Sequence, residues 1–185
     1  MDTNWLVFFI WPILEARAEI LQNFSVTFWA MEFQKKFFFW DLLTVKGDTL
    51  ALFMENRPEY VAIWLGLAKI GVIPALINHN LKNIALAHAI QSANCLSLIY
   101  GSELAHEVSE IYSNLNNGSK AYPTFLSGPP SQTIANICST IDLNDNLFNV
   151  SKDPVSQMIQ DSIGFNDKLL YIYTSGTTGA VYILG

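Results

Sequence analysis

Apolar and polar positions alternate in a regular rhythm from residue 46 onwards. Short apolar runs bounded by turn residues predict buried strands over 49–53, 72–77, 96–100, 121–126 and 169–173. Between them, apolar residues at helical spacing predict helices over 58–70, 82–92 and 103–115. Strands that alternate with helices are typical of a parallel sheet covered by helices. The pattern therefore predicts an α/β fold, a mostly parallel sheet with helices on both faces.

The ends of the first predicted helix carry recognisable signals. Pro58 stands in the first turn, where a missing N–H costs nothing, and Gly71 follows the last turn. Asn56 precedes the proline, and an asparagine side chain can cap the free amides of a helix start. We therefore expect Asn56 to cap this helix.

The chain becomes irregular between residues 128 and 167. Asp153 and Pro154 predict a short helix that runs to Asp161, and the rest reads as loop or extra turns. The strand at 169–173 and a last short strand at 180–184 follow. If the partners of the 169–173 strand lie outside this chain, it forms an unpaired edge, which is prone to aggregation.

Residues 1–45 have a different character from the rest. Residues 5–14 are nearly all apolar but too short for a membrane-spanning helix, which needs about 20 residues. Residues 24–43 are rich in aromatics, with charged residues among them. Aromatic and basic side chains favour the headgroup level of a membrane. Two interpretations of this lead segment stay open: it lies in a membrane interface, or it packs on the domain that follows.

Composition and charge exclude some functions. The 185 residues are 51% hydrophobic and 14% charged, with a net charge of -6. An acidic chain without a cluster of basic residues lacks the electrostatic footprint of a nucleic-acid-binding protein. The cysteines and histidines show no metal-ligand spacing, and we expect them to be packing or surface residues: Cys95, Cys138, His79, His88 and His106.

Candidate chemistry lies near the end of the chain. The strand residues 171–173 run directly into six small residues, Thr174, Ser175, Gly176, Thr177, Thr178 and Gly179. Glycines let a backbone approach a ligand closely, and successive backbone amides in such a turn form an anion-binding concavity. Hydroxyl groups add donors for phosphate oxygens. The stretch predicts a loop that binds the phosphates of a nucleotide; the alternative is an ordinary surface turn between strands.

Several stretches together resemble one family. Thr-Ser-Gly-Thr-Thr-Gly after Tyr-Ile-Tyr resembles the phosphate-binding signature of adenylate-forming enzymes, the acyl-CoA synthetase group. The stretches 51–60, 64–71, 75–78 with 80–81, 101–103 and 164–171 are similar to the fatty acid transport proteins, which are very-long-chain acyl-CoA synthetases. The resemblance covers residues 46–179.

This resemblance implies a function. Members of the family use ATP and Mg²⁺ to convert a fatty acid to an acyl-adenylate, and then pass the acyl group to coenzyme A (CoA). The resemblance further implies coupling to fatty acid uptake, and a membrane-associated, cytosol-facing location at the endoplasmic reticulum or plasma membrane. It assigns the ATP phosphates to Thr174–Gly179 and implies that residues 46–185 are a partial AMP-binding domain, the first part of the adenylate-forming fold.

The departures from the family pattern limit the expected activity. The family's loop continues into a lysine, and Tyr182 stands at that position here. A tyrosine cannot supply the mobile positive charge of a lysine. The adenine and ribose motifs and the small C-terminal domain are expected after residue 185. We therefore expect the chain to be a fragment with weak or no synthetase activity alone. Two alternatives stay open: a non-catalytic α/β module that binds a nucleotide or a partner, and a membrane-interface protein with a vestigial loop.

Overall fold

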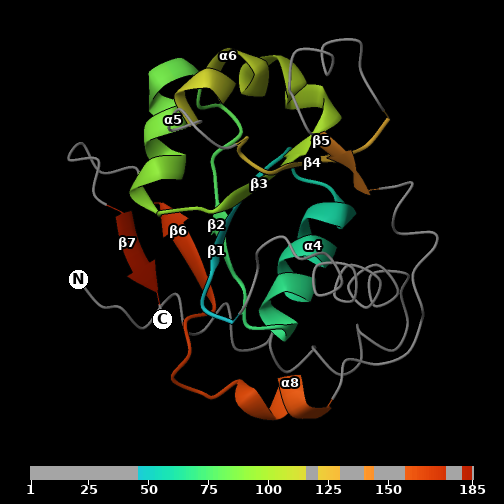
Figure 1. Cartoon of the computed structure of the whole chain (residues 1–185), viewed down its shortest axis with the longest axis vertical. Helices are drawn as coiled ribbons and strands as arrows, with labels where there is room; N and C mark the ends of the chain where they lie inside the picture. The colour runs from blue at the N-terminus through green and yellow to red at the C-terminus, as the bar shows by residue number, and fades with distance from the viewer. Residues whose placement is uncertain (1–45, 116–120, 130–139, 144–156, 174–180, 185) are drawn as a thin grey trace.

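A single sheet organises the described part of the chain. The computed structural model describes residues 46–115, 121–129, 140–143, 157–173 and 181–184. Its strands form one sheet in the order β5-β4-β3-β1-β2-β6-β7 (Figure 1). All neighbouring pairs are parallel except β6 and β7, which are antiparallel. The strands are β1 Thr49–Phe53, β2 Ile73–Leu76, β3 Ser97–Gly101, β4 Thr124–Ser127, β5 Thr140–Asp142, β6 Leu170–Tyr173 and β7 Val181–Leu184.

Helices cover both faces of this sheet. Four are described: α4 Pro58–Lys69, α5 Asn83–Ser92, α6 Ala105–Leu115 and the short α8 Gln157–Ser162. A 3₁₀ turn, Ser102–Leu104, leads into α6. The chain moves one way across the sheet from β1 to β2 and the other way from β2 to β3 and β4. Right-handed crossovers therefore put α4 on one face, and α5 and α6 on the other.

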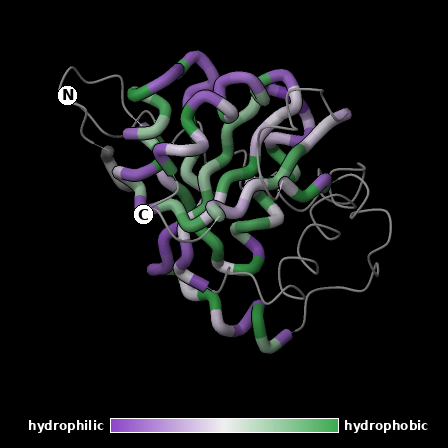
Figure 2. The backbone as a smooth tube through the Cα atoms, turned by 45° about the horizontal axis from the view of Figure 1, so that its top comes forward, coloured by the Kyte–Doolittle hydropathy of each residue, from purple (hydrophilic) through white to green (hydrophobic). Residues whose placement is uncertain are grey.

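Two hydrophobic clusters, one on each face, confirm this layering. Ala51 and Phe53 of β1 lie in the cluster with α5 and α6, whereas Leu50 and Leu52 lie in the cluster with α4. All four side chains are fully buried. A strand covered on both faces needs a continuous apolar run rather than alternation. Figure 2 shows this as a mainly hydrophobic centre with hydrophilic stretches on the outer helices.

The predicted α/β fold is confirmed, with local corrections at the element ends. Arg57, not Asn56, occupies the position before α4, so the predicted asparagine cap is wrong. The third helix begins at Ala105 rather than at residue 103, because the chain first makes the 3₁₀ turn. The apolar stripe predicted for this helix is buried as expected: Leu104, Val108, Ile111 and Leu115.

The stretch after residue 127 needed two further corrections. The structure places β5 within the predicted irregular segment, paired in parallel with β4. Its three residues are half-buried and lack an apolar run, which explains why the pattern did not reveal a strand. The expectation of an unpaired edge at 169–173 is wrong, because β6 pairs with β2 on one side and β7 on the other.

The lead segment lies outside this description. Residues 1–45 are not among the described residues, so both of their interpretations stay predictions. Within the part of the chain that is described, no helix has the length and apolar character needed to cross a membrane.

Candidate functional site

The carboxyl ends of the parallel strands define the candidate site. Ligands of open parallel sheets bind at this edge of the sheet. Strand β6 is parallel to β2, so its carboxyl end lies on the same edge as those of β1 to β4. The predicted phosphate loop, Thr174 to Gly179, follows Tyr173 directly in the sequence and lies outside the described residues. The described part of β6 ends at Tyr173, directly before the predicted loop.

A side-chain hydrogen bond holds the carboxyl end of β6. The hydroxyl of Tyr173 donates to the backbone carbonyl of Ala89 on α5, with an oxygen–oxygen distance of 2.8 Å. Tyr171, two residues earlier, lies in the buried cluster on the same face. Burial raises the pKa of the Tyr173 hydroxyl above its usual value, so this group stays protonated and remains a donor at neutral pH.

An ion pair occupies the point where the strand order reverses. Strands β1 and β3 are neighbours, but the chain leaves them toward opposite faces of the sheet. Arg57 follows β1 and Glu103 follows β3, and their Nη1 and Oε2 atoms lie 3.0 Å apart. The other carboxylate oxygen, Oε1, accepts from the Glu55 amide at 3.0 Å. Nη2 of Arg57 donates to the Ser127 carbonyl at the end of β4 at 2.9 Å.

Two glycines make room for this arrangement. A Cβ at Gly101 would overlap the carboxylate of Glu103, and one at Gly128 would overlap the hydroxyl of Ser102. Gly128 also has a φ of +115°, which other residues rarely adopt. The ends of β1, β3 and β4 are thereby held together by one arginine and one glutamate. This network lies at the switch point between β1 and β3.

Sequence reasoning did not single out these two charges. Arg57 and Glu103 both stood within the stretches that carry the family resemblance, a few residues after predicted strands. Charged residues at neighbouring carboxyl ends are the signal that could have paired them. Because 46 positions separate them, the strand order was needed to show that they meet.

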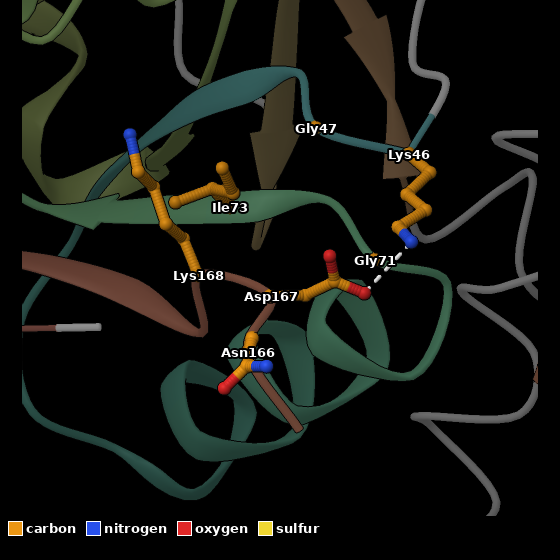
Figure 3. A pocket seen from close by; sticks show the side chains of 7 residues that line it. All are labelled: Lys46, Gly47, Gly71, Ile73, Asn166, Asp167 and Lys168. Carbon is orange, nitrogen blue, oxygen red and sulfur yellow. Dashed lines mark ion pairs between the residues drawn. The ribbon is translucent and has the colours of Figure 1, made fainter. Parts of the chain in front are cut away.

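A cavity lies at the opposite, amino edge of the sheet. It has a volume of about 330 Å³ and is lined by Lys46, Gly47, Gly71, Ile73, Asn166, Asp167 and Lys168 (Figure 3). Lys46 and Asp167 form an ion pair of 2.7 Å across it, while the side chain of Lys168 extends away from this pair. The Asp167 carboxylate also accepts from the Gly164 amide at 2.6 Å. This cavity lies across the sheet from the end of β6, so it is separate from the candidate nucleotide site.

The electrostatics of the cavity follow from these contacts. The hydrogen bond from Lys46 and that from the Gly164 amide hold the pKa of Asp167 below its usual value. Lys46 additionally donates to the Ser162 carbonyl at the end of α8. The ion pair therefore connects the segment before β1 to the segment before β6.

Cys95, among the described residues, lacks the features of a reactive thiol. Cys95 is a free, buried thiol, and burial raises its pKa to about 12. A thiol that stays protonated at neutral pH is a poor nucleophile. Cys138 lies outside the described residues. Within the described ranges, no three His, Cys, Asp or Glu side chains gather to hold a metal ion.

Known proteins resemble this chain in sequence. The family model "AMP-binding enzyme" matches residues 42–180. Long-chain fatty acid transport protein 1 of Rattus norvegicus is 40% identical over 133 residues, which cover 72% of this chain and 20% of that protein. Long-chain fatty acid transport protein 2 of the same species is 36% identical over 134 residues, or 72% of this chain and 21% of that protein. The chain thus spans about a fifth of the length of these curated relatives.

Solved structures resemble it in fold. The anthranilate CoA ligase AuaEII in complex with anthranoyl-AMP superposes with a TM-score of 0.63 at 21% identity, over 84% of this chain and 27% of that one. The N-terminal domain of FACL13 from Mycobacterium tuberculosis gives a TM-score of 0.61 at 21% identity, over 85% and 35% of the two chains. At this identity the likeness establishes the fold. The family model covers more than half of the chain, and it shows that this chain belongs to the AMP-binding enzyme family.

Proposed function

We propose that this chain is part of an ATP-dependent fatty acid–CoA ligase coupled to fatty acid uptake. In the first half-reaction, a carboxylate oxygen of the fatty acid attacks the α-phosphorus of ATP and pyrophosphate leaves. In the second, the CoA thiol attacks the acyl carbon, its proton is lost and AMP leaves. The 40% identity to a long-chain fatty acid transport protein supports a fatty acid as substrate.

The position of β6 is the observation that carries the nucleotide assignment. This strand is held on both sides within the sheet, and its carboxyl end lies on the edge where parallel sheets bind ligands. We propose that Thr174, Ser175, Gly176, Thr177, Thr178 and Gly179 hold the ATP phosphates through backbone amides and hydroxyls. These groups bind and orient the polyphosphate, which exposes the α-phosphorus to attack.

The proposed reaction also needs Mg²⁺, CoA and the fatty acid. Mg²⁺ neutralises phosphate charge when it is bound, and it commonly reaches such sites through the phosphates and a few carboxylates. We propose that Mg²⁺ arrives as the ATP complex. We propose CoA and the fatty acid as the other two substrates of the enzyme.

The domain arrangement and location complete the proposal. We propose that residues 46–185 are a partial AMP-binding domain, and that residues 1–45 are a lead segment that contacts the membrane interface. The resulting enzyme would face the cytosol at the endoplasmic reticulum or the plasma membrane.

Flotation of the chain with liposomes, with and without residues 1–45, tests the lead segment. Equal flotation of the two forms contradicts a membrane role for it.

Calorimetric titration of the chain with Mg·ATP tests the nucleotide site. We expect binding, and we expect Ser175→Ala to weaken it by about 10-fold, because a hydrogen bond to a charged group contributes about 1.5 kcal/mol. Ser162→Ala is the control, since its hydroxyl donates to the Ile159 carbonyl at the amino edge of the sheet. No binding up to millimolar ATP, or equal effects of the two variants, contradicts the assignment.

A separate assay tests what the chain does alone. Adenylation needs reactants and charge-stabilising groups positioned together, and the phosphate loop supplies only part of them. We therefore expect no measurable acyl-CoA formation from ATP, CoA and fatty acid by the purified chain. Formation of acyl-CoA that depends on all three substrates would overturn this expectation.

A further inference from the structure

The last residue of β6 is held differently from those before it. Tyr171 and Ile172 pair with Ala75 and Leu76 of β2, and the parallel register between the two strands ends there. Tyr173 lies one residue beyond that ladder and pairs only with Val181 of β7 among the described strand registers. Its hydroxyl bond to Ala89 of α5, on the face of the sheet that the helix covers, gives this position a further contact.

The acceptor of this bond is suited to the role. Ala89 lies in the last turn of α5, where carbonyl groups have lost their helical partners. Its carbonyl accepts from the Tyr173 hydroxyl at 2.8 Å and from the Ser92 hydroxyl at 3.0 Å. Helix α5 is itself fixed, because Leu86 and Ile90 are buried in the core cluster. The bond therefore connects the strand end to a rigid part of the molecule.

The side-chain directions in β6 explain why a tyrosine stands here. Residues 171 and 173 point to the same face of the sheet because successive strand side chains alternate. Tyr171 belongs to the cluster beneath α5, and the ring of Tyr173 packs against the same cluster. A phenylalanine could fill this space, but it could not donate to Ala89. The hydroxyl thus has a role beyond packing.

We propose that Tyr173 is a positioning residue for the nucleotide site. Its hydrogen bond to Ala89 fixes the carboxyl end of β6, and with it the point from which Thr174 continues. This inference rests on the proposed function of residues 174–179. Small displacements of groups that orient a reactant can have large effects on a reaction, so the start of a phosphate-binding segment is a place where such fixing matters.

The variant Tyr173→Phe, compared with Tyr112→Phe, tests this role. The hydroxyl of Tyr112, on α6, also donates to a backbone carbonyl, that of Tyr122, at 3.2 Å. Each variant loses one partly buried hydroxyl hydrogen bond, so we expect similar small falls in the urea midpoint. Only Tyr173→Phe should weaken Mg·ATP binding, by about 5-fold, as expected for one lost hydrogen bond. Equal ATP affinity of Tyr173→Phe and wild type overturns the inference and leaves the nucleotide site in place.

Hydrogen exchange separates this inference from the proposed function. We expect amides of residues 171–175 to exchange about 5-fold faster in Tyr173→Phe without nucleotide, and to stay unchanged in Tyr112→Phe. If wild type binds no ATP, the function fails, but this exchange result still decides whether Tyr173 holds the strand end. Unchanged exchange in Tyr173→Phe, or an equal change in both variants, overturns the positioning role.

Discussion

The two edges of the sheet each carry an ion pair, but the pairs are built differently. At the amino edge, the side chains of Lys46 and Asp167 are 41% and 35% exposed. At the carboxyl edge, those of Arg57 and Glu103 are 26% and 25% exposed. The arginine also reaches Ser127, and the glutamate also accepts from Glu55. The carboxyl-edge network is therefore more desolvated and joins more strand ends.

The difference in burial between the two ion pairs indicates how firmly each edge of the sheet is held. An exposed pair contributes little because water and salt screen it, so the amino-edge pair only joins two approaching segments. A partly buried pair is costly to leave half-made, because the remaining charge lacks a partner. The carboxyl edge is thus held in one arrangement at the ends of β1, β3 and β4. That is the edge on which the nucleotide-binding segment starts.

Removal of the arginine should give the largest effect. Arg57→Ala leaves the Glu103 carboxylate without its cation, and we expect a loss of about 2–3 kcal/mol in the free energy of unfolding. Urea denaturation measures it. Lys46→Met at the amino edge is the matched change, with an expected loss of less than about 1 kcal/mol. Equal losses would remove the distinction between the two edges.

A smaller loss should follow from filling the space beside the glutamate. Gly101 has a φ of −77°, which alanine adopts readily, so Gly101→Ala would stabilise the chain if the space were free. Its Cβ instead displaces the Glu103 carboxylate, and we expect a net loss of about 1–2 kcal/mol. In an Arg57→Ala background the loss should shrink, because there is no pair left to break. Additive losses would contradict this coupling.

At the amino edge, a glycine variant should act through the backbone. Gly71 has a φ of +75°, and a Cβ there would crowd the Lys46 side chain. We expect Gly71→Ala to cost more than about 1 kcal/mol, because the backbone conformation strains an alanine and the Lys46 Cγ, 2.9 Å from the new Cβ, must shift. Thermal unfolding measures this cost. Full recovery of stability in combination with Lys46→Ala, which removes that Cγ, would exclude the contribution of backbone strain.

The smallest effect should come from the pH dependence of Asp167. Its pKa is lowered in the folded chain, so its contribution to stability is present above the ordinary aspartate pKa of about 4. That contribution is lost as the pH falls through the lowered value. We expect Asp167→Asn to be less stable than wild type at pH 7 and to match it at low pH. A constant difference across the titration would exclude this ion pair as its cause.

The hydrophobic pattern was sufficient to predict the strands and helices that bury apolar surface. Strand β1 is fully buried, so its apolar run was unambiguous, and α6 shows a clear buried stripe. Strand β5 was missed because its pairing with β4 depends on backbone groups, and its side chains are only half-buried. In the helix predicted over 82–92, the apolar residue Ile84 is 80% exposed. Local periodicity therefore did not show which side of α5 meets the sheet.

Only the part of the candidate site that forms one continuous stretch of sequence could be predicted. The six small residues after β6 form one continuous stretch and could be recognised as a possible phosphate loop. The contacts around that edge are not local: Arg57 meets Ser127 across 70 positions, and Tyr173 meets Ala89 across 84. These pairings follow from the strand order, which the pattern of apolar residues does not specify. Single polar residues near strand ends gave no sign of their partners.

The order of the strands also has a consequence for how the chain folds. Strands β1 to β4 are neighbours in the sheet and follow one another in sequence, whereas β6 must join β2 from the far side. Contacts between distant parts of a chain form late, because closing a long loop is entropically costly. Until β6 arrives, the outer edge of β2 is open to other chains. Slow docking of β6 during synthesis would thus favour aggregation of partly folded chains. Fast docking of β6 would therefore raise the amount of folded protein in the cell.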